Sequence, residues 1–155
     1  MADTELLLNL AKAINYAYAA GVIDGEGSIH VHKLKSTKEF TYNYGLRVTV
    51  MMTEIRVIQW LVDTFGGKVE RGDRKVKSNV SVTGRTYYLW RLTGDRCKEF
   101  LESIRPYSRG KQDQIDLALE FPLGFRGIGV PIEARAKQSQ IYSDLKLLHL
   151  GKEVA

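Results

Sequence analysis

The sequence predicts an α+β domain in which helices cover one face of an antiparallel sheet and leave the other face open. Two observations support this fold class. Apolar residues recur at helical spacing in some segments, while β-branched and aromatic residues alternate in others, in the order α-β-β-α-β-β-α followed by C-terminal helices. The length of 155 residues suits a single domain. Residues 1–122 are expected to form its core, and residues 123–155 a C-terminal helical extension of the same domain.

A long N-terminal helix is expected to lead into a β-hairpin. Asp3 or Thr4 is placed to cap a helix that runs to about Ile23, and the glycines that follow are placed to end it. Strands are expected over about residues 28–35 and 40–51, with a short turn between them. Together they make the first ββ pair.

A second ββ unit with its own helices is expected next. Thr53 precedes a segment with apolar residues at helical spacing, which continues to Gly66. Strand character returns over residues 68–71 and 80–92. The remaining helices are expected over residues 93–104, 109–121 and 132–150.

The cysteine content and the N-terminus bear on the compartment. Cys97 is the one cysteine, which excludes an intrachain disulfide or a multi-cysteine zinc site and suits a reducing compartment. The N-terminus lacks the basic start and apolar core of a secretory signal, and no apolar run is expected to span a bilayer. We therefore expect an intracellular protein, cytoplasmic or organellar, with no membrane partner.

The net charge of +5 is unevenly distributed along the chain. Residues 31–112 carry 17 Lys and Arg against eight Asp and Glu, whereas the segments on either side are slightly acidic. A middle segment this basic is able to attract a polyanion, of which nucleic acid is the usual one. A solvated surface with a basic bias accounts for the same numbers.

The end of the first predicted helix carries two acids around a glycine, in the order Asp24-Gly25-Glu26-Gly27. The negative end of the helix dipole disfavours a carboxylate there, and a divalent cation would offset the repulsion. Magnesium is typically held by one or two carboxylates together with phosphate oxygens. Two such helix ends side by side would make a phosphodiester-cleaving metal site. An exposed turn with two solvated acids accounts for these residues equally well.

Small residues form a stripe along the same helix, at Ala13, Ala17, Ala20 and Gly21. Small side chains let a neighbouring backbone approach closely. That neighbour is either this chain's own sheet or a helix of another chain.

Residues 19–27, Ala-Ala-Gly-Val-Ile-Asp-Gly-Glu-Gly, resemble the LAGLIDADG motif of a family of homing endonucleases. The expected element order also matches that family's αββαββα fold over most of residues 5–121. The resemblance implies a site-specific DNA endonuclease, associated with intron or intein mobility, that makes double-strand breaks in a long pseudo-palindromic site. It implies Mg²⁺ as the metal, for which Mn²⁺ or Ca²⁺ can substitute in binding, and no small-molecule cofactor.

The resemblance also implies roles for individual residues. Glu26 would bind the catalytic metal, with Gly25 beside it in the metal site. The chain holds a single copy of the motif, so the motif helices of two copies would form a homodimer. The implied interface residues are Ala13, Ala17, Ala20, Gly21 and Asp24, of which Asp24 would cap or brace the turn.

Lys111 matches a family lysine near the start of the helix after the last strand pair. The resemblance implies that it polarises the scissile phosphate or positions the attacking water. Taken without the resemblance, Lys111 is an ordinary exposed lysine on a helix.

The resemblance places the open face of the sheet in the major groove of double-stranded DNA. Residues two apart on a strand share a face, so Ser28 and its even-numbered neighbours are expected to face the DNA. Arginines pair with guanine edges, and lysines mainly contact phosphate. The expected DNA-binding residues are Ser28, His30, His32, Lys33, Lys35, Arg47, Thr49, Lys68, Arg71, Arg74, Lys75, Lys77 and Arg85.

One departure from the family pattern bears on activity. The family often has a glutamine at the end of the second strand, where this sequence has Val50-Met51-Met52. A LAGLIDADG protein that binds nucleic acid without cutting it, such as a maturase or a regulator, is therefore an alternative. An unrelated α+β interaction module with basic hairpins is a further one.

Overall fold

The computed structural model describes residues 2–35, 42–74, 84–125 and 129–154. Its helices and strands follow one another in the order α1 (Ala2–Glu26), β1 (Gly27–Lys35), β2 (Tyr42–Met52), α2 (Ile55–Phe65), β3 (Lys68–Arg74), β4 (Arg85–Thr93), α3 (Gly94–Ile104), α4 (Gln112–Leu119) and α5 (Ile132–His149). The predicted α+β class and its αββαββα order with C-terminal helices are confirmed.

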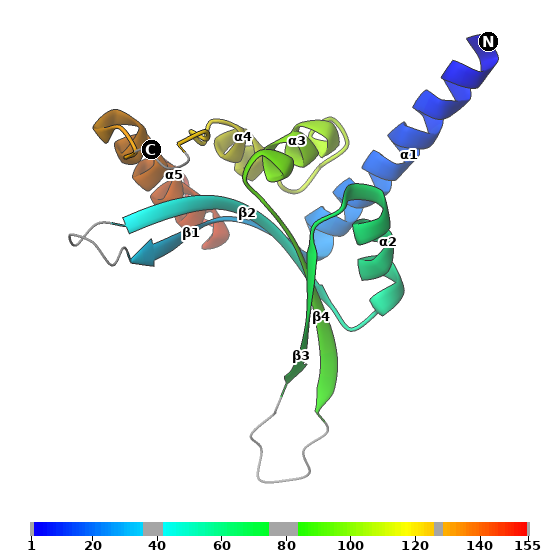
Figure 1. Ribbon diagram of the computed structural model, residues 1–155, viewed down its shortest axis with the longest axis horizontal. Coiled ribbons are helices and arrows are strands. Elements are labelled where there is room, and N and C mark those ends of the chain that lie inside the picture. Colours follow the sequence, from blue (N-terminus) through cyan, green and yellow to red (C-terminus); the bar gives the residue numbers. More distant parts are fainter. Residues whose placement is uncertain (1, 36–41, 75–83, 126–128, 155) are drawn as a thin grey trace.

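The four strands form one antiparallel sheet in the order β1-β2-β4-β3. The sheet is strongly curved: β1 and β2 run across the molecule, while β3 and β4 descend from it as a projecting hairpin (Figure 1). The helices lie on the outer side of the curve, with α3, α4 and α5 over β1 and β2, the end of α1 against β1, β2 and α3, and α2 beside β3 and β4 (Figure 1). The inner side of the curve carries no helix among the described residues.

The alternation of side chains along the strands explains this arrangement. Ile29 and Val31 of β1 are buried, and so are Leu46, Val48 and Val50 of β2. Successive residues of a strand point to opposite faces, so these positions form the helix-covered face. The core also holds a buried tryptophan, Trp90 of β4, whose Nε1 donates to the carbonyl oxygen of Gly66 at 2.8 Å.

Several helix ends differ from the prediction. α1 begins at Ala2, so Asp3 and Thr4, which were expected to cap it, lie inside the helix. α1 continues to Glu26 instead of ending near Ile23, and the chain changes to strand at the second of the two expected stop glycines, Gly27, which pairs with Val50 of β2. α4 begins at Gln112 instead of residue 109, because the backbone N–H groups of Arg109 and Gly110 bond to a carboxylate outside the helix. At α4, a contact distant in sequence sets the boundary.

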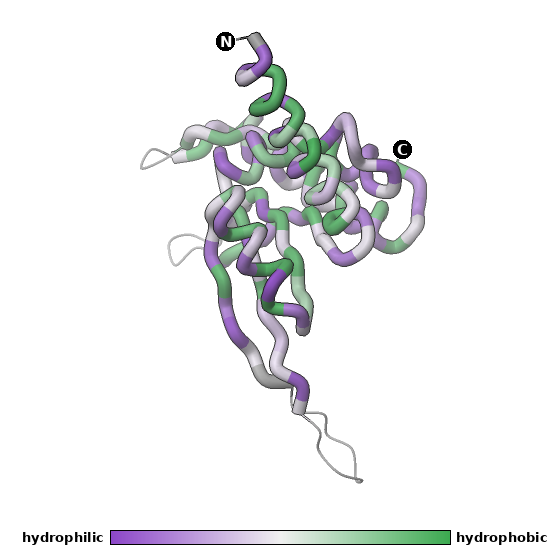
Figure 2. The backbone as a smooth tube through the Cα atoms, turned by 90° about the vertical axis from the view of Figure 1, so that its right-hand side faces the viewer, coloured by the Kyte–Doolittle hydropathy of each residue, from purple (hydrophilic) through white to green (hydrophobic). Residues whose placement is uncertain are grey.

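The N-terminal half of α1 projects from the body of the protein (Figure 2). Leu10 and Ile14 keep 55% and 60% of their surface exposed. Contrary to the expectation from sequence, Asp3–Glu26 is long and apolar enough to cross a membrane by length and composition, because Lys12 is the one charge between Glu5 and Asp24. The core helix of a soluble protein or a signal sequence passes the same test.

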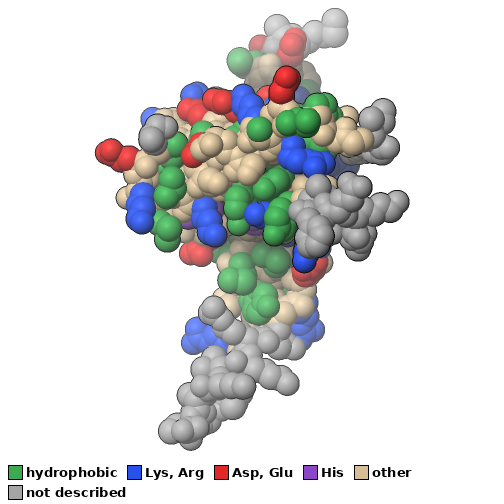
Figure 3. Space-filling model, turned by 90° about the vertical axis from the view of Figure 1, so that its left-hand side faces the viewer, with side chains coloured by type: hydrophobic (Ala, Val, Ile, Leu, Met, Phe, Trp, Pro, Cys, Tyr) green, Lys and Arg blue, Asp and Glu red, His purple; other side chains and the backbone are tan. Residues whose placement is uncertain are grey.

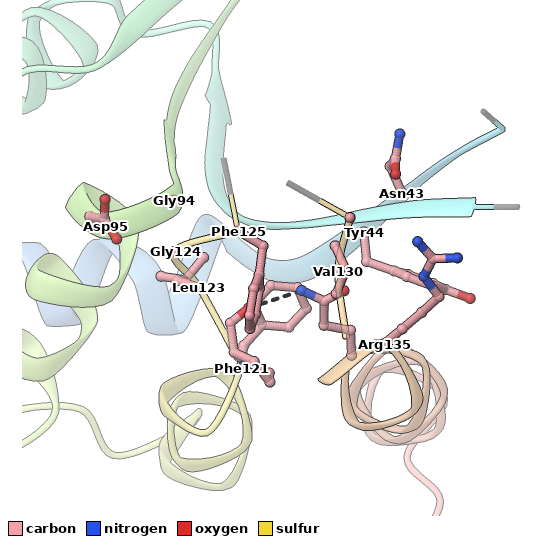
Figure 4. Close-up of a pocket in the computed structure, with 13 residues that line it drawn as sticks. Asn43, Tyr44, Gly94, Asp95, Phe121, Leu123, Gly124, Phe125, Val130 and Arg135 are labelled. Carbon is pink, nitrogen blue, oxygen red and sulfur yellow. Dashed lines mark hydrogen bonds between the residues drawn. The ribbon is translucent and has the colours of Figure 1, made fainter. Parts of the chain in front are cut away.

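The C-terminal segment packs on the same sheet as the rest of the chain. Ile141 and Leu145 of α5 are buried in the common core, and the hydroxyl of Tyr44 on β2 donates to Ser139 at 3.2 Å. A pocket of about 540 Å³ lies between β2, the start of α3 and the segment that leads into α5, lined in part by Phe121 and Arg135 (Figure 4). None of the site residues expected from the sequence lines it.

Candidate metal site and nucleic-acid interface

Glu26 is the last residue of α1 and is exposed to solvent. Its carboxylate therefore lies at the end of α1, where the chain continues into β1. Among the described residues the carboxylate accepts no hydrogen bond. It does interact electrostatically with the charged ammonium group of Lys111. Glu26 therefore presents two carboxylate oxygens that the fold itself does not use.

Lys111 lies against the same end of α1. Its ammonium group donates to the carbonyl oxygens of Ile23 at 2.6 Å and Asp24 at 2.8 Å. These are among the last carbonyls of the helix, which have no partner within it, and a cation there is favoured by the helix dipole. Partial burial lowers the pKa of Lys111, whereas the charges of Asp24 and Glu26 act in the opposite direction. The structure thus brings together the two residues that the resemblance singled out.

Asp24 is engaged within its own chain. Its Oδ1 accepts a hydrogen bond from the Ser108 hydroxyl at 2.6 Å, and its Oδ2 accepts from the backbone N–H groups of Arg109 at 2.7 Å and Gly110 at 3.1 Å. Burial raises the pKa of Asp24, but these three hydrogen bonds and Lys111 outweigh it and leave that pKa below its usual value. Asp24 was expected to cap or brace the turn after α1. In the structure its carboxylate bonds to the loop between α3 and α4.

The donors present in one chain fit half of a magnesium site. No group of three or more His, Cys, Asp or Glu side chains placed to hold a metal occurs among the described residues. One exposed carboxylate is what a protein contributes when phosphate oxygens and water supply the other ligands of magnesium. Glu26 fits that role, and Asp24, with both oxygens occupied, does not.

The inner face of the sheet carries the expected polar residues of β1 and β2. Ser28, His30 and His32 lie opposite Thr49, Arg47 and Gly45, respectively, on adjacent strands. Burial, together with the charge of Arg47, lowers the pKa of His30 to about 4, so its imidazole is neutral near pH 7. The pKa of His32 is lowered for the same two reasons.

Arg91 of β4 belongs to this face but was not among the residues expected from the sequence. It lies opposite Thr49 of β2 on one side and Lys68 of β3 on the other, and it forms an ion pair with Glu70. A hollow of about 490 Å³ is lined by four cationic side chains and His32. The cationic residues are Arg47, Lys68, Arg91 and Arg96.

The sequence did hold a signal for Arg91, because it alternates with the apolar residues Trp90 and Leu92 on β4. Placing Arg91 next to Arg47 and Thr49 also requires knowing that β4 pairs with β2. Sequence spacing alone does not say which strands are neighbours. Basic side chains are spread over the side of the molecule that faces left in Figure 1, and some flank the base of the projecting hairpin (Figure 3). Basic side chains thus occur both on the inner face and on the β3–β4 hairpin.

Lys33 is an expected DNA-binding residue that lies off the inner face. Lys33 shares the parity of Val31 and so points to the helix-covered side, where its ammonium lies 3.8 Å from the ring centre of Tyr42 and 5.5 Å from that of Tyr142 on α5. Exposed positions on the strands or their ends are held by Lys35, Lys68, Arg71 and Arg85. Arg74 is the last residue of β3, and Lys75 and Lys77 lie outside the described residues.

The expected interface residues of α1 divide into two groups. Ala17 and Gly21 are exposed, and a Cβ built on Gly21 or on Gly25 meets no atom within 4 Å. Ala20 is completely buried in the core of its own chain, and Ala13 is half-buried. The stripe of small residues is therefore split. Part of it packs in the chain's own core, and part of it is exposed on the other side of α1.

The end of β2 has no polar side chain at the positions that depart from the family pattern. Val50 is buried, Met52 is half-buried and Met51 is 47% exposed. Arg56, the nearest basic residue in sequence, is held by Glu54, whose carboxylate accepts from its Nε at 2.9 Å and its Nη2 at 2.9 Å. Glu54, rather than Thr53, is the N-cap of α2, because its Oε1 also accepts from the backbone N–H of Arg56 at 3.0 Å.

The chain matches no family model and no curated protein sequence. Its structure does have counterparts. The curved four-stranded sheet, with a long helix leading into it, is the fold of the LAGLIDADG homing endonucleases, and the resemblance seen in the sequence is confirmed at the level of the fold.

The similarity to I-CvuI extends over nearly the whole chain. It covers 94% of this chain and 88% of I-CvuI, with a TM-score of 0.69 and 19% sequence identity, in crystals of that homing endonuclease with a DNA target. The archaeal intron-encoded homing endonuclease I-Vdi141I, complexed with DNA, has a TM-score of 0.66 and 16% identity over 86% of this chain and 82% of its own. At such identities the similarity is one of fold.

Proposed function

We propose that the protein is a magnesium-dependent, site-specific DNA endonuclease that acts as a homodimer on a long pseudo-palindromic site. The observation that carries the proposal is the position of Glu26, an exposed carboxylate at the end of α1 with the ammonium of Lys111 beside it. Homing endonucleases of the same fold have been crystallised with DNA in the presence of magnesium or calcium. Because its substrate would be DNA, the protein would act in a compartment that contains DNA, either the cytoplasm or an organelle.

The inner face of the sheet supports DNA as the substrate. Cationic side chains of Arg47, Lys68 and Arg91, together with Arg96 of α3, line one hollow that His32 also lines, and burial lowers the pKa of both His30 and His32. A curved basic surface attracts the phosphate backbone, while arginines and neutral imidazoles offer hydrogen bonds to base edges. Binding is expected to weaken steeply as salt rises, because many phosphates would be contacted.

The exposed side of α1 supports a homodimer. Leu10, Ile14, Ala17 and Gly21 recur every three or four residues and form one continuous face with no partner among the described residues. A second α1 packed against Gly21 and Gly25 would approach closely, because neither position carries a side chain. Such a pair would bring two copies of Glu26 near one another and complete the half-site that one chain provides.

The chemistry follows from the residues at this end of α1. Bound magnesium would supply Lewis-acid stabilisation of the charge that develops on the scissile phosphate. Glu26 would hold the cation, and Lys111 would present a positive charge to the phosphate from the side. Asp24 would keep the loop before α4 in place. Each subunit would then act on one strand.

The direct test is cleavage of a randomised target library with magnesium by the wild type and by Glu26→Gln. The variant is expected to lose cleavage while it still binds DNA in calcium, because the amide keeps the shape but not the charge of the ligand. Glu102→Gln, a change at an exposed glutamate of α3, is the matched control and is expected to cut normally. Equal cutting by Glu26→Gln and wild type would refute the assignment of Glu26.

A second candidate function is nucleic-acid binding without cleavage. The apolar Val50 and Met51 at the end of β2 favour it, because they leave this edge of the site without a hydrogen-bonding side chain to order water. DNA affinity together with no cleavage of any library member, in magnesium or manganese, would select this alternative.

A further inference from the structure

Ser108 is a buried polar residue that the proposed function does not use. It has no exposed surface and lies in the loop between α3 and α4, where its backbone N–H donates to the carbonyl oxygen of Ile104 at 3.1 Å. A buried hydroxyl costs stability unless it is hydrogen-bonded. The hydroxyl of Ser108 is bonded through both of its functions, as a donor and as an acceptor.

The donor function reaches the end of α1. The Ser108 hydroxyl donates to Oδ1 of Asp24 at 2.6 Å, a short contact of the charge-assisted kind. The other oxygen of Asp24 is already held by the backbone of Arg109 and Gly110. Among the described residues Ser108 supplies the one bond found on Oδ1, and it thereby sets the direction of the carboxylate.

The acceptor function reaches Lys111. The backbone N–H of Lys111 lies 3.4 Å from the Ser108 hydroxyl oxygen, at the residue that precedes α4. The ammonium of Lys111 bonds in turn to the carbonyl oxygens of Ile23 and Asp24. A closed ring of contacts results, which runs from Asp24 through Ser108 and Lys111 back to the end of α1.

We propose that Ser108 is a positioning residue, which holds the Lys111 ammonium at the end of α1 next to Glu26. Without the ring, a lysine side chain samples many rotamers and its charge has no fixed place. With the ring, the backbone of Lys111 is attached on one side and its ammonium on the other. The role of Ser108 in catalysis rests on the proposed function, whereas its role in placing Lys111 does not.

The test uses Ser108→Ala in the full-length protein, with Ser103→Ala as the matched control. Ser103 carries a hydroxyl that donates to the Glu99 carbonyl oxygen within α3, away from the ring. Selective ¹⁵N NMR of the lysine ammonium groups reports on Lys111 without DNA. Single-turnover cleavage in magnesium and DNA affinity in calcium report on function.

Ser108→Ala is expected to move or broaden the Lys111 ammonium resonance and to slow cleavage by roughly tenfold or more, because small displacements of a positioned group are costly. DNA affinity is expected to change less than about twofold, since phosphate contacts spread over the sheet determine it. Ser103→Ala is expected to alter none of the three measurements. A merely structural role for Ser108 would lower affinity and rate together.

An unchanged Lys111 resonance in folded Ser108→Ala would overturn the proposal, whatever the cleavage rate. If the wild type does not cut any DNA, the proposed function fails, yet the resonance still decides whether Ser108 places Lys111. If Ser108→Ala does not fold, Asp24→Asn breaks the same ring from its other side. The proposal then requires the Asp24→Asn resonance of Lys111 to move, and it falls if that resonance stays in place.

Discussion

The imidazole of His32 lies directly against Gly45 across the β1–β2 pair, so that a Cβ on residue 45 would be 2.1 Å from Cε1 of His32. The glycine makes room for the histidine, and the histidine in turn borders the basic hollow on the inner face. This arrangement links a backbone position on β2 to a side chain expected to contact DNA.

Gly45→Ala is therefore expected to displace His32 and to destabilise the fold by about 1 kcal/mol, since extra volume forces the ring from its rotamer. In a His32→Ala background the same change is expected to cost almost nothing. Urea unfolding of the four proteins measures the coupling between the two positions. Equal costs in both backgrounds would show that the two residues do not share this space.

Gly21→Leu is expected to leave the folded subunit intact, because a side chain at residue 21 meets open space and leucine is a better helix former than glycine. In a dimer that closes on this face, the same change would weaken association at least tenfold. Sedimentation velocity over a concentration series measures it. Lys12 lies half a turn away from Gly21 around α1, so Lys12→Ala is the control and should leave the dimer unaffected.

Stability is expected to fall in acid because of His30. Burial and Arg47 lower its pKa from the usual 6.5 to about 4, so the unfolded chain binds the proton more readily than the folded one. The contribution is fully present above about pH 6.5 and is lost as the pH falls towards 4. About 1 to 2 kcal/mol is expected after allowance for solvent screening.

Urea unfolding at pH 7 and pH 4.5, compared between wild type and His30→Gln, measures this contribution. The variant should lose less stability between the two pH values than the wild type does. His149→Gln is a second test, because the charge of His149 on α5 also lowers the pKa of His30, and it should reduce the pH dependence by less than His30→Gln does. An identical pH dependence in His30→Gln and wild type would contradict the assignment.

Cys97 is expected to be inert in the folded protein. Burial raises the pKa of its thiol to about 12, so hardly any thiolate exists at pH 8. Reaction with a thiol reagent should be slow in buffer and complete within minutes in guanidinium chloride. Fast reaction under native conditions would mean that α3 opens readily.

Much of the fold was predictable because it depends on local patterns. Strand alternation located β1 and β2, and helical spacing located α2 and α3, since burial on one side imposes these periods. The sequence predicted that Asp24 and Glu26 lie at the end of α1. It did not predict which of the two carboxylates is hydrogen-bonded within the chain and which is exposed. Both are acids within one turn of chain, and sequence spacing does not distinguish a solvated carboxylate from one bonded to a loop 84 residues away.

The sequence by itself determined the αββαββα order, the acid at the end of α1 and the basic character of the middle segment, because these follow from residue types and their spacing. Only the tertiary structure decided that Lys111 meets the end of α1, that Ala20 faces inward while Gly21 faces outward, and that Arg91 joins Arg47 on the open face. The physical reason is common to all three. Each depends on which elements become neighbours when the sheet curves and the helices pack, and these contacts join residues that are distant along the chain.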